Sequence, residues 1–124
     1  RDEAIAAFVK SQAQLALVEK ATKPEVLEKY LITSLYYRAF SALGADNLEA
    51  PKGDFVAPFE KLIQVVNEKG TQEKNKAYLI DAHTYIGFYQ YNKNEIAKAK
   101  ASFQEVLKLD PENESAKSYL EGLK

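Results

Sequence analysis

Cysteine is absent from this sequence of 124 residues, and its absence excludes a disulfide framework and thiolate metal sites. The redox compartment stays open, because a chain without cysteine folds in a reducing or an oxidising environment. An excess of one charge is also missing, since 17 basic side chains stand against 18 acidic ones, for a net charge of −1. So balanced a chain lacks the attraction that captures nucleic acid or an anionic membrane. We expect no nucleic-acid partner.

Long apolar runs are missing as well. No stretch approaches the ~20 residues that a helix needs to span a bilayer, so we expect no membrane insertion of this domain. The chain opens at Arg1, without methionine and without the pattern of a signal peptide. We therefore expect a piece of a longer protein, and leave open whether a signal or anchor segment has been removed from it.

Motifs for catalysis, cofactors and metals are also lacking. His83 is the only histidine, and without a cysteine or a second imidazole it forms no familiar metal pair or nucleophile-base couple. We assign it a packing role. The acidic residues Asp46, Glu49 and Asp54 lack the alternating spacing of an EF-hand loop. With no serine in a recognised catalytic motif and no glycine-rich phosphate loop, we expect no enzyme activity, no cofactor and no metal.

What the sequence does contain is helical periodicity. Prolines and glycines number only 4 and 5, and several of them fall between periodic segments rich in alanine, leucine, glutamate and lysine. This pattern predicts an all-α fold of about six helices. The expected helices span about 2–20, 23–43, 54–69, 72–91, 95–109 and 111–124.

Capping signals set several of these boundaries. Thr22 opens a capping box in front of the second helix, and Gly44 is expected to end that helix. Asp54 is the expected cap of the third helix. Asp110 is the expected cap of the sixth, with Pro111 in its first helical position.

Gly87, Ala99, Phe103 and Pro111 are separated by spacings of twelve, four and eight residues, the frame of a tetratricopeptide repeat. In that repeat two antiparallel helices cross closely, so small residues stand at the crossing and an aromatic ring fills the gap beside it. The segment Asp81–Asn113 resembles one full repeat. This resemblance to the tetratricopeptide family implies a right-handed α-α superhelix of helical hairpins that acts as a binding scaffold.

A second, weaker copy of the repeat precedes it. Ala39 stands at the position of Gly87, and Phe59 at the position of Phe103. Phe55 lies sixteen residues after Ala39 instead of twelve, so the loop holds four extra residues, and Phe55 stands where the repeat has a small residue. The pattern of apolar residues still predicts a helical hairpin here.

We therefore expect a single tetratricopeptide-like domain over residues 1–124. Its parts are a flanking helix (1–21), a degenerate hairpin with a long loop (23–69), a hairpin (72–109) and a capping helix (111–124). The tyrosine-rich first helices and the long loop are similar to those of bacterial tetratricopeptide proteins that are exported or associated with the cell envelope. That likeness suggests a bacterial envelope or periplasmic location but leaves the compartment open.

The first helix of each hairpin is apolar on almost every side. In the tetratricopeptide family these helices line a concave surface, so the resemblance places five residues along one groove: Tyr36, Phe40, Thr84, Phe88 and Tyr91. Aromatic rings desolvate a large area with little loss of rotamer entropy, so this groove is the candidate site for a peptide or protein segment. The lysine and asparagine clamp that binds a terminal carboxylate in the family is missing from these positions.

Two interpretations of this aromatic stripe stay open. In the first, it is an open groove that binds a peptide or protein partner. In the second, the flanking helix or another copy of the chain covers the stripe, which is then ordinary core. The corresponding alternative function is structural: self-association, or docking on the remainder of a longer protein.

Overall fold

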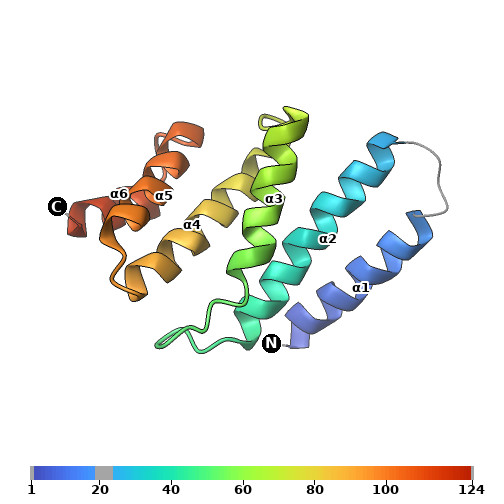
Figure 1. The fold of residues 1–124 in the computed structure, drawn as a ribbon, viewed down its shortest axis with the longest axis horizontal. Helices are drawn as coiled ribbons and strands as arrows, with labels where there is room; N and C mark the ends of the chain where they lie inside the picture. The colour runs from blue at the N-terminus through green and yellow to red at the C-terminus, as the bar shows by residue number, and fades with distance from the viewer. Residues whose placement is uncertain (1, 19–23, 124) are drawn as a thin grey trace. The chain divides into compact units, whose positions relative to one another are not determined.

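The computed structural model describes residues 2–18 and 24–123, and within these ranges it is all-helical, with six helices and no strand (Figure 1). The prediction of an all-α fold is confirmed. Thr22 lies outside the described residues. The helices are α1 (Asp2–Val18), α2 (Pro24–Ala45), α3 (Val56–Lys69), α4 (Lys76–Asn92), α5 (Ile96–Leu109) and α6 (Glu114–Gly122).

The chain forms two compact units, residues 1–65 and residues 66–124, which divide within α3. The first unit contains α1, α2, the loop after α2 and most of α3. The second contains the end of α3 with α4, α5 and α6. Each unit has its own aromatic contacts.

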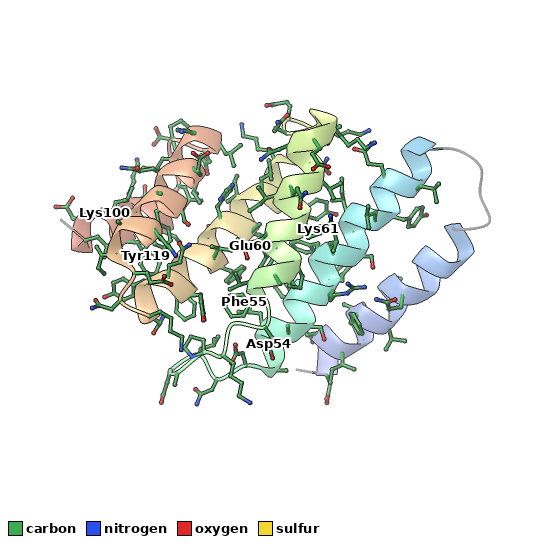
Figure 2. All side chains as sticks on the ribbon, viewed as in Figure 1. Asp54, Phe55, Glu60, Lys61, Lys100 and Tyr119 are labelled. Atoms are coloured by element: carbon green, nitrogen blue, oxygen red, sulfur yellow. The ribbon has the colours of Figure 1, made fainter. Side chains whose placement is uncertain are left out.

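In the first unit, two phenylalanines at the start of α3 lie at the centre of the core. Phe55 and Phe59 are fully buried, and their rings lie 6.4 Å apart, edge to face. Phe55 stands where the loop meets α3 (Figure 2). The ring of Tyr36 on α2 meets Phe59 edge-on at 6.4 Å. These contacts fix α3 against α2, while α1 packs along the same helix (Figure 1).

In the second unit, the core is organised around the ring of Phe103 on α5. This fully buried ring points its tip at Gly87 of α4, where an added Cβ atom would stand 2.8 Å from Cζ. Its face stacks on the ring of Tyr119 from α6, with 4.5 Å between centroids and 4° between planes. Figure 2 labels Tyr119. Gly87 therefore lies where α4 and α5 touch, as the repeat frame predicts.

Left-handed residues end two of the helices. Gly70, with a φ of 66°, follows α3, and the N–H of Thr71 donates to the carbonyl of Val66 at 3.1 Å. Asn94, with a φ of 61°, closes the predicted turn after α4, and the N–H of Glu95 donates to the carbonyl five residues back at 2.9 Å. Both arrangements satisfy carbonyl groups that the helix end leaves open, and the second makes α4 and α5 an antiparallel hairpin.

The predicted start of the last helix is wrong. α6 begins at Glu114, and its cap is Asn113, whose side-chain oxygen accepts the N–H of Ala116 at 2.9 Å. The carboxylate of Asp110 instead accepts the backbone N–H two residues further on at 3.2 Å. Such a local turn competes with helix formation, and it holds Pro111 in the turn before α6.

Three other predicted boundaries also shift. α2 continues past Gly44 to Ala45, because the left-handed glycines among the described residues are Gly53 and Gly70 and the backbone at Gly44 stays helical. α3 begins at Val56, after a turn that includes Asp54, and α4 begins at Lys76, four residues after the predicted start at residue 72. At α3 and α4 a turn occupies residues that were assigned to the helix, whereas at α2 the helix includes residues that were assigned to the loop.

Replacing Gly87 by leucine is expected to lower the free energy of unfolding by about 1–3 kcal/mol or more. The new Cβ would collide with the Phe103 ring, which is fully buried and stacked on Tyr119, so the ring has little room to retreat. Urea unfolding followed by circular dichroism measures the change.

Gly122→Ala is the matched control, because a Cβ atom at Gly122 has no neighbour within 4 Å. This substitution should be neutral, or stabilising by up to about 1 kcal/mol through helix propensity. Equal unfolding midpoints for Gly87→Leu and the parent chain would contradict the close contact between α4 and α5.

Candidate functional site

The first-unit half of the predicted groove is an aromatic cluster on α2. The centroid of the Tyr36 ring lies 5.6 Å from that of Phe40 and 5.5 Å from that of Tyr37. Tyr36 and Phe40 are four residues apart, so a helix places them on one face. Tyr36 is half-buried, whereas Phe40 keeps 36% of its surface exposed. The cluster therefore extends from the core contact with Phe59 to the surface.

The first two turns of α1 form the opposite wall of this cluster. Between the two helices lies a hollow of about 290 Å³. It is lined by Glu3, Ala4, Ala7, Tyr36, Tyr37 and Phe40. The two alanines are too small to fill the space between the helices. The flanking helix thus lies beside Tyr36 and Phe40 and leaves Phe40 partly open to solvent.

The second-unit half of the predicted groove lies on α4. The hydroxyl of Thr84 donates to the carbonyl of Ile80 at 2.7 Å, within its own helix. Phe88 is half-buried, whereas Tyr91 is 45% exposed and meets Tyr119 edge-on at 5.9 Å. In this half, Tyr91 is the predicted site residue that offers the most surface to a partner.

The structure groups the predicted site residues within the two units. Tyr36 and Phe40 belong to residues 1–65, and the three residues on α4 belong to residues 66–124. Each set shares one face of its helix, because the spacings are four residues in α2 and four and three in α4. One continuous groove through both sets stays a prediction.

The structural positions of the repeat are largely internal. Ala39, Ala99 and Phe103 are fully buried, and Gly87 is buried. Pro111 is the exception, because it is exposed in the turn before α6. The frame therefore identified core contacts well and the last helix boundary poorly.

Tyr37 is the site residue that the sequence did not single out. It follows Tyr36 directly, so a helix turns it by about 100° from its neighbour's face. The tyrosine still lines the hollow because α1 packs along this side of α2. Two adjacent tyrosines next to an alanine-rich helix are the signal that marks it.

The acidic loop between α2 and α3 is organised by one carboxylate. Oδ1 of Asp46 accepts the N–H groups of Asn47 at 2.8 Å and Lys52 at 2.9 Å, and Oδ2 accepts that of Gly53 at 3.0 Å. Desolvation raises the pKa of Asp46, but the three hydrogen bonds and the charge of Lys52 together lower it below its usual value. Within the described part of the chain, no group of three or more potential ligand side chains is arranged to hold a metal ion.

Replacing Asp46 by alanine is expected to lower the stability of the first unit at pH 7 by about 1 kcal/mol. Three N–H groups lose a charged acceptor, and the partial exposure of the site to solvent keeps the effect modest. Because folding lowers the pKa of Asp46, its stabilisation is complete above the unfolded pKa of about 3.9 and is lost as the pH falls through the folded value.

Thermal unfolding from about pH 7 to pH 2.5 tests this linkage. The difference in Tm between parent and Asp46→Ala should hold down to about pH 5 and shrink below about pH 4. Glu49→Ala, in the same exposed loop, controls for the loss of one negative charge. A difference that keeps its full size at the lowest pH would rule out the carboxylate as the cause.

His83 lies half-buried in α4. Burial lowers the pKa of its imidazole, and the negative charge of Glu105 on α5 opposes this shift. A neutral imidazole inside a helical hairpin is consistent with the packing role that the sequence suggests.

No family model matches the chain, and no match was found among curated proteins or solved structures. The resemblance to tetratricopeptide repeats therefore depends on the residue frame and on the packing of Phe103 against Gly87. Among the described helices, none is long and apolar enough to cross a membrane.

Proposed function

We propose that this chain is a non-enzymatic interaction module that binds a peptide or protein segment along the aromatic faces of α2 and α4. In this proposal the hairpins α2–α3 and α4–α5 are tetratricopeptide-like and form a right-handed superhelical scaffold. The observation that carries the proposal is the exposure of Phe40 and Tyr91, at 36% and 45%. Both stand at predicted groove positions, and partly exposed aromatic side chains are efficient anchors for a partner.

The packing of α4 on α5 next to Tyr91 favours binding. Next to the Gly87 contact, the hydroxyl of Ser102 on α5 donates to the side-chain oxygen of Gln90 on α4 at 2.6 Å. The last turns of α4 are thus held by an apolar and a polar contact, at Gly87 and Gln90, and Tyr91 starts from a fixed position. A preorganised surface loses less entropy on binding. The small contact area limits the affinity, which we expect to be about micromolar.

Selection from a random-peptide display library against the whole chain tests this function, with affinities measured by calorimetry. Phe40→Ser and Tyr91→Ser should each weaken binding of the selected peptides about tenfold, because each removes an aromatic anchor. Leu48→Ser is the matched control, since Leu48 is a large apolar residue that is 52% exposed outside the predicted groove.

The pattern of losses also locates the site. If both variants weaken the same peptide, the peptide contacts both units. If only one does, the site is confined to that unit. Peptides whose affinity is unchanged by both substitutions would contradict the proposal.

A second candidate function, self-association, is favoured by the outer face of α1. Ala4 and Ala7 face the hollow beside α2, whereas Ile5 and Val9 are turned away from it and are 46% and 60% exposed. A helix that is apolar on both sides is usually covered on both sides. In this alternative, a second copy of the chain covers the outer face of α1.

Sedimentation velocity over a range of protein concentrations tests the alternative. If α1 mediates self-association, the parent chain forms a reversible dimer, and the double variant Ile5→Ser, Val9→Ser stays monomeric with unchanged helix content. Ala6→Ser, also on the exposed part of α1, should dimerise as the parent does. A parent chain that is monomeric up to about 1 mM would exclude the alternative, because such weak association has no role at ordinary concentrations.

A further inference from the structure

One wall of the hollow between α1 and α2 consists of aromatic rings from α2 that are set at angles to each other. The rings of Tyr36 and Tyr37 are 5.5 Å apart with 75° between their planes. The ring of Phe40 lies 5.6 Å from that of Tyr36, tilted by 34°. All three residues line the same hollow. The faces of aromatic rings carry partial negative charge and attract cations, and groups of such rings recognise ammonium ligands.

Glu3 adds a full negative charge to this aromatic lining. It is the one ionisable carboxylate among the six lining residues, and none of the six is basic. The other lining residues from α1 are Ala4 and Ala7, whose methyl groups leave space in front of the rings. The lining therefore combines aromatic rings, a carboxylate and room for a ligand.

The size of the hollow limits what it can take. The volume of about 290 Å³ is just below the range of about 300–1,000 Å³ that is typical of small-molecule sites. The space suits one cationic head group and the end of its aliphatic stem. A lysine or arginine side chain has this form, because its stem packs on apolar surface while its head group stays charged.

The same pairing of cation and ring occurs elsewhere in the chain. In the second unit, Nζ of Lys93 lies 5.6 Å from the centroid of the Tyr89 ring. That distance is within the range of a cation-π interaction. There the cation is a lysine of the chain itself, and the contact shows that a tyrosine ring of this protein accepts an ammonium group.

We infer that this hollow binds the cationic side chain of a lysine or arginine in a bound peptide. Its head group lies against Tyr36, Tyr37 and Phe40 and faces the carboxylate of Glu3. The inference rests on the proposed function, because a bound peptide supplies the cation. It adds the chemical identity of the side chain that is recognised at the α2 half of the site.

The first experiment uses tetramethylammonium chloride as a probe of the hollow. The methyl resonances of Ala4 and Ala7 in the ¹³C-labelled chain should shift saturably, with a dissociation constant in the millimolar range of about 1–50 mM. Neopentyl alcohol has nearly the same shape, with one added hydroxyl group and no charge, and should cause no saturable shift at equal concentration. Sodium chloride controls for ionic strength. Equal responses to the ammonium and the alcohol would overturn the inference.

Variants then assign the binding to the lining residues. Phe40→Leu and Tyr37→Leu should each raise the dissociation constant of the probe about fivefold, because each removes one aromatic ring from the lining. Tyr30→Leu, a tyrosine of α2 outside the lining, is the control for the rings. Glu3→Gln should raise the dissociation constant of the probe about threefold or more. Asp2→Asn is the control, because it removes the same charge outside the lining, and it should have a smaller effect. Equal effects of the two acidic substitutions would overturn the role of Glu3.

The peptide experiment separates this inference from the proposed function. In peptides selected against the chain, replacing lysine by norleucine or arginine by citrulline should weaken binding about tenfold, and Phe40→Leu should abolish that difference. Peptides that bind without this dependence, together with no response to the probe, overturn the inference and leave the proposed function standing. If the hollow binds the probe but no peptide is selected, a peptide is not the source of the cation, and the proposed function is wrong as well.

Discussion

The second unit depends on the contact between Gly87 and the ring of Phe103. Because Gly87 has no side chain, α4 and α5 approach closely enough for the ring tip to meet the backbone. The face of the same ring is then available to Tyr119, which fixes α6 against the hairpin. Tyr119 in turn contacts Tyr91. A contact in the core therefore determines the position of the most exposed residue in this half of the candidate site, through two successive rings.

The first unit connects core and surface by a different route. Phe59 takes the place of Phe103, and the ring of Tyr36 on the preceding helix α2 meets it edge-on. Tyr36 then contacts Phe40 at the surface. The longer loop of this hairpin remains ordered because the carboxylate of Asp46 satisfies three backbone N–H groups that would otherwise need water. The four extra residues of the loop therefore leave the packing of α3 on α2 intact.

Much of the helical architecture could be predicted because periodicity and turn residues are local signals. The turn at Asn94 and the end of α3 at Gly70 both follow from residues that adopt left-handed backbone easily. The start of α6 could not be predicted in this way. Asp110 and Asn113 are both good caps, and the choice between them depends on which side chain reaches a helical N–H group. Asn113 reaches Ala116, while Asp110 is engaged in its own turn.

The candidate site was less accessible to sequence reasoning because it depends on contacts between helices. The spacing of Tyr36 and Phe40 places them on one face, but no local pattern indicates how far α1 covers that face. Tyr37 illustrates the difficulty, since it points about 100° away from its neighbour and enters the site only because α1 packs beside it. Glu3 is an ordinary acidic residue in the first turn of a helix until Ala4 and Ala7 are seen to leave a hollow next to it. Charge, small side chains and aromatic rings each have common structural explanations, and they become a site only where the packing of two helices brings them together.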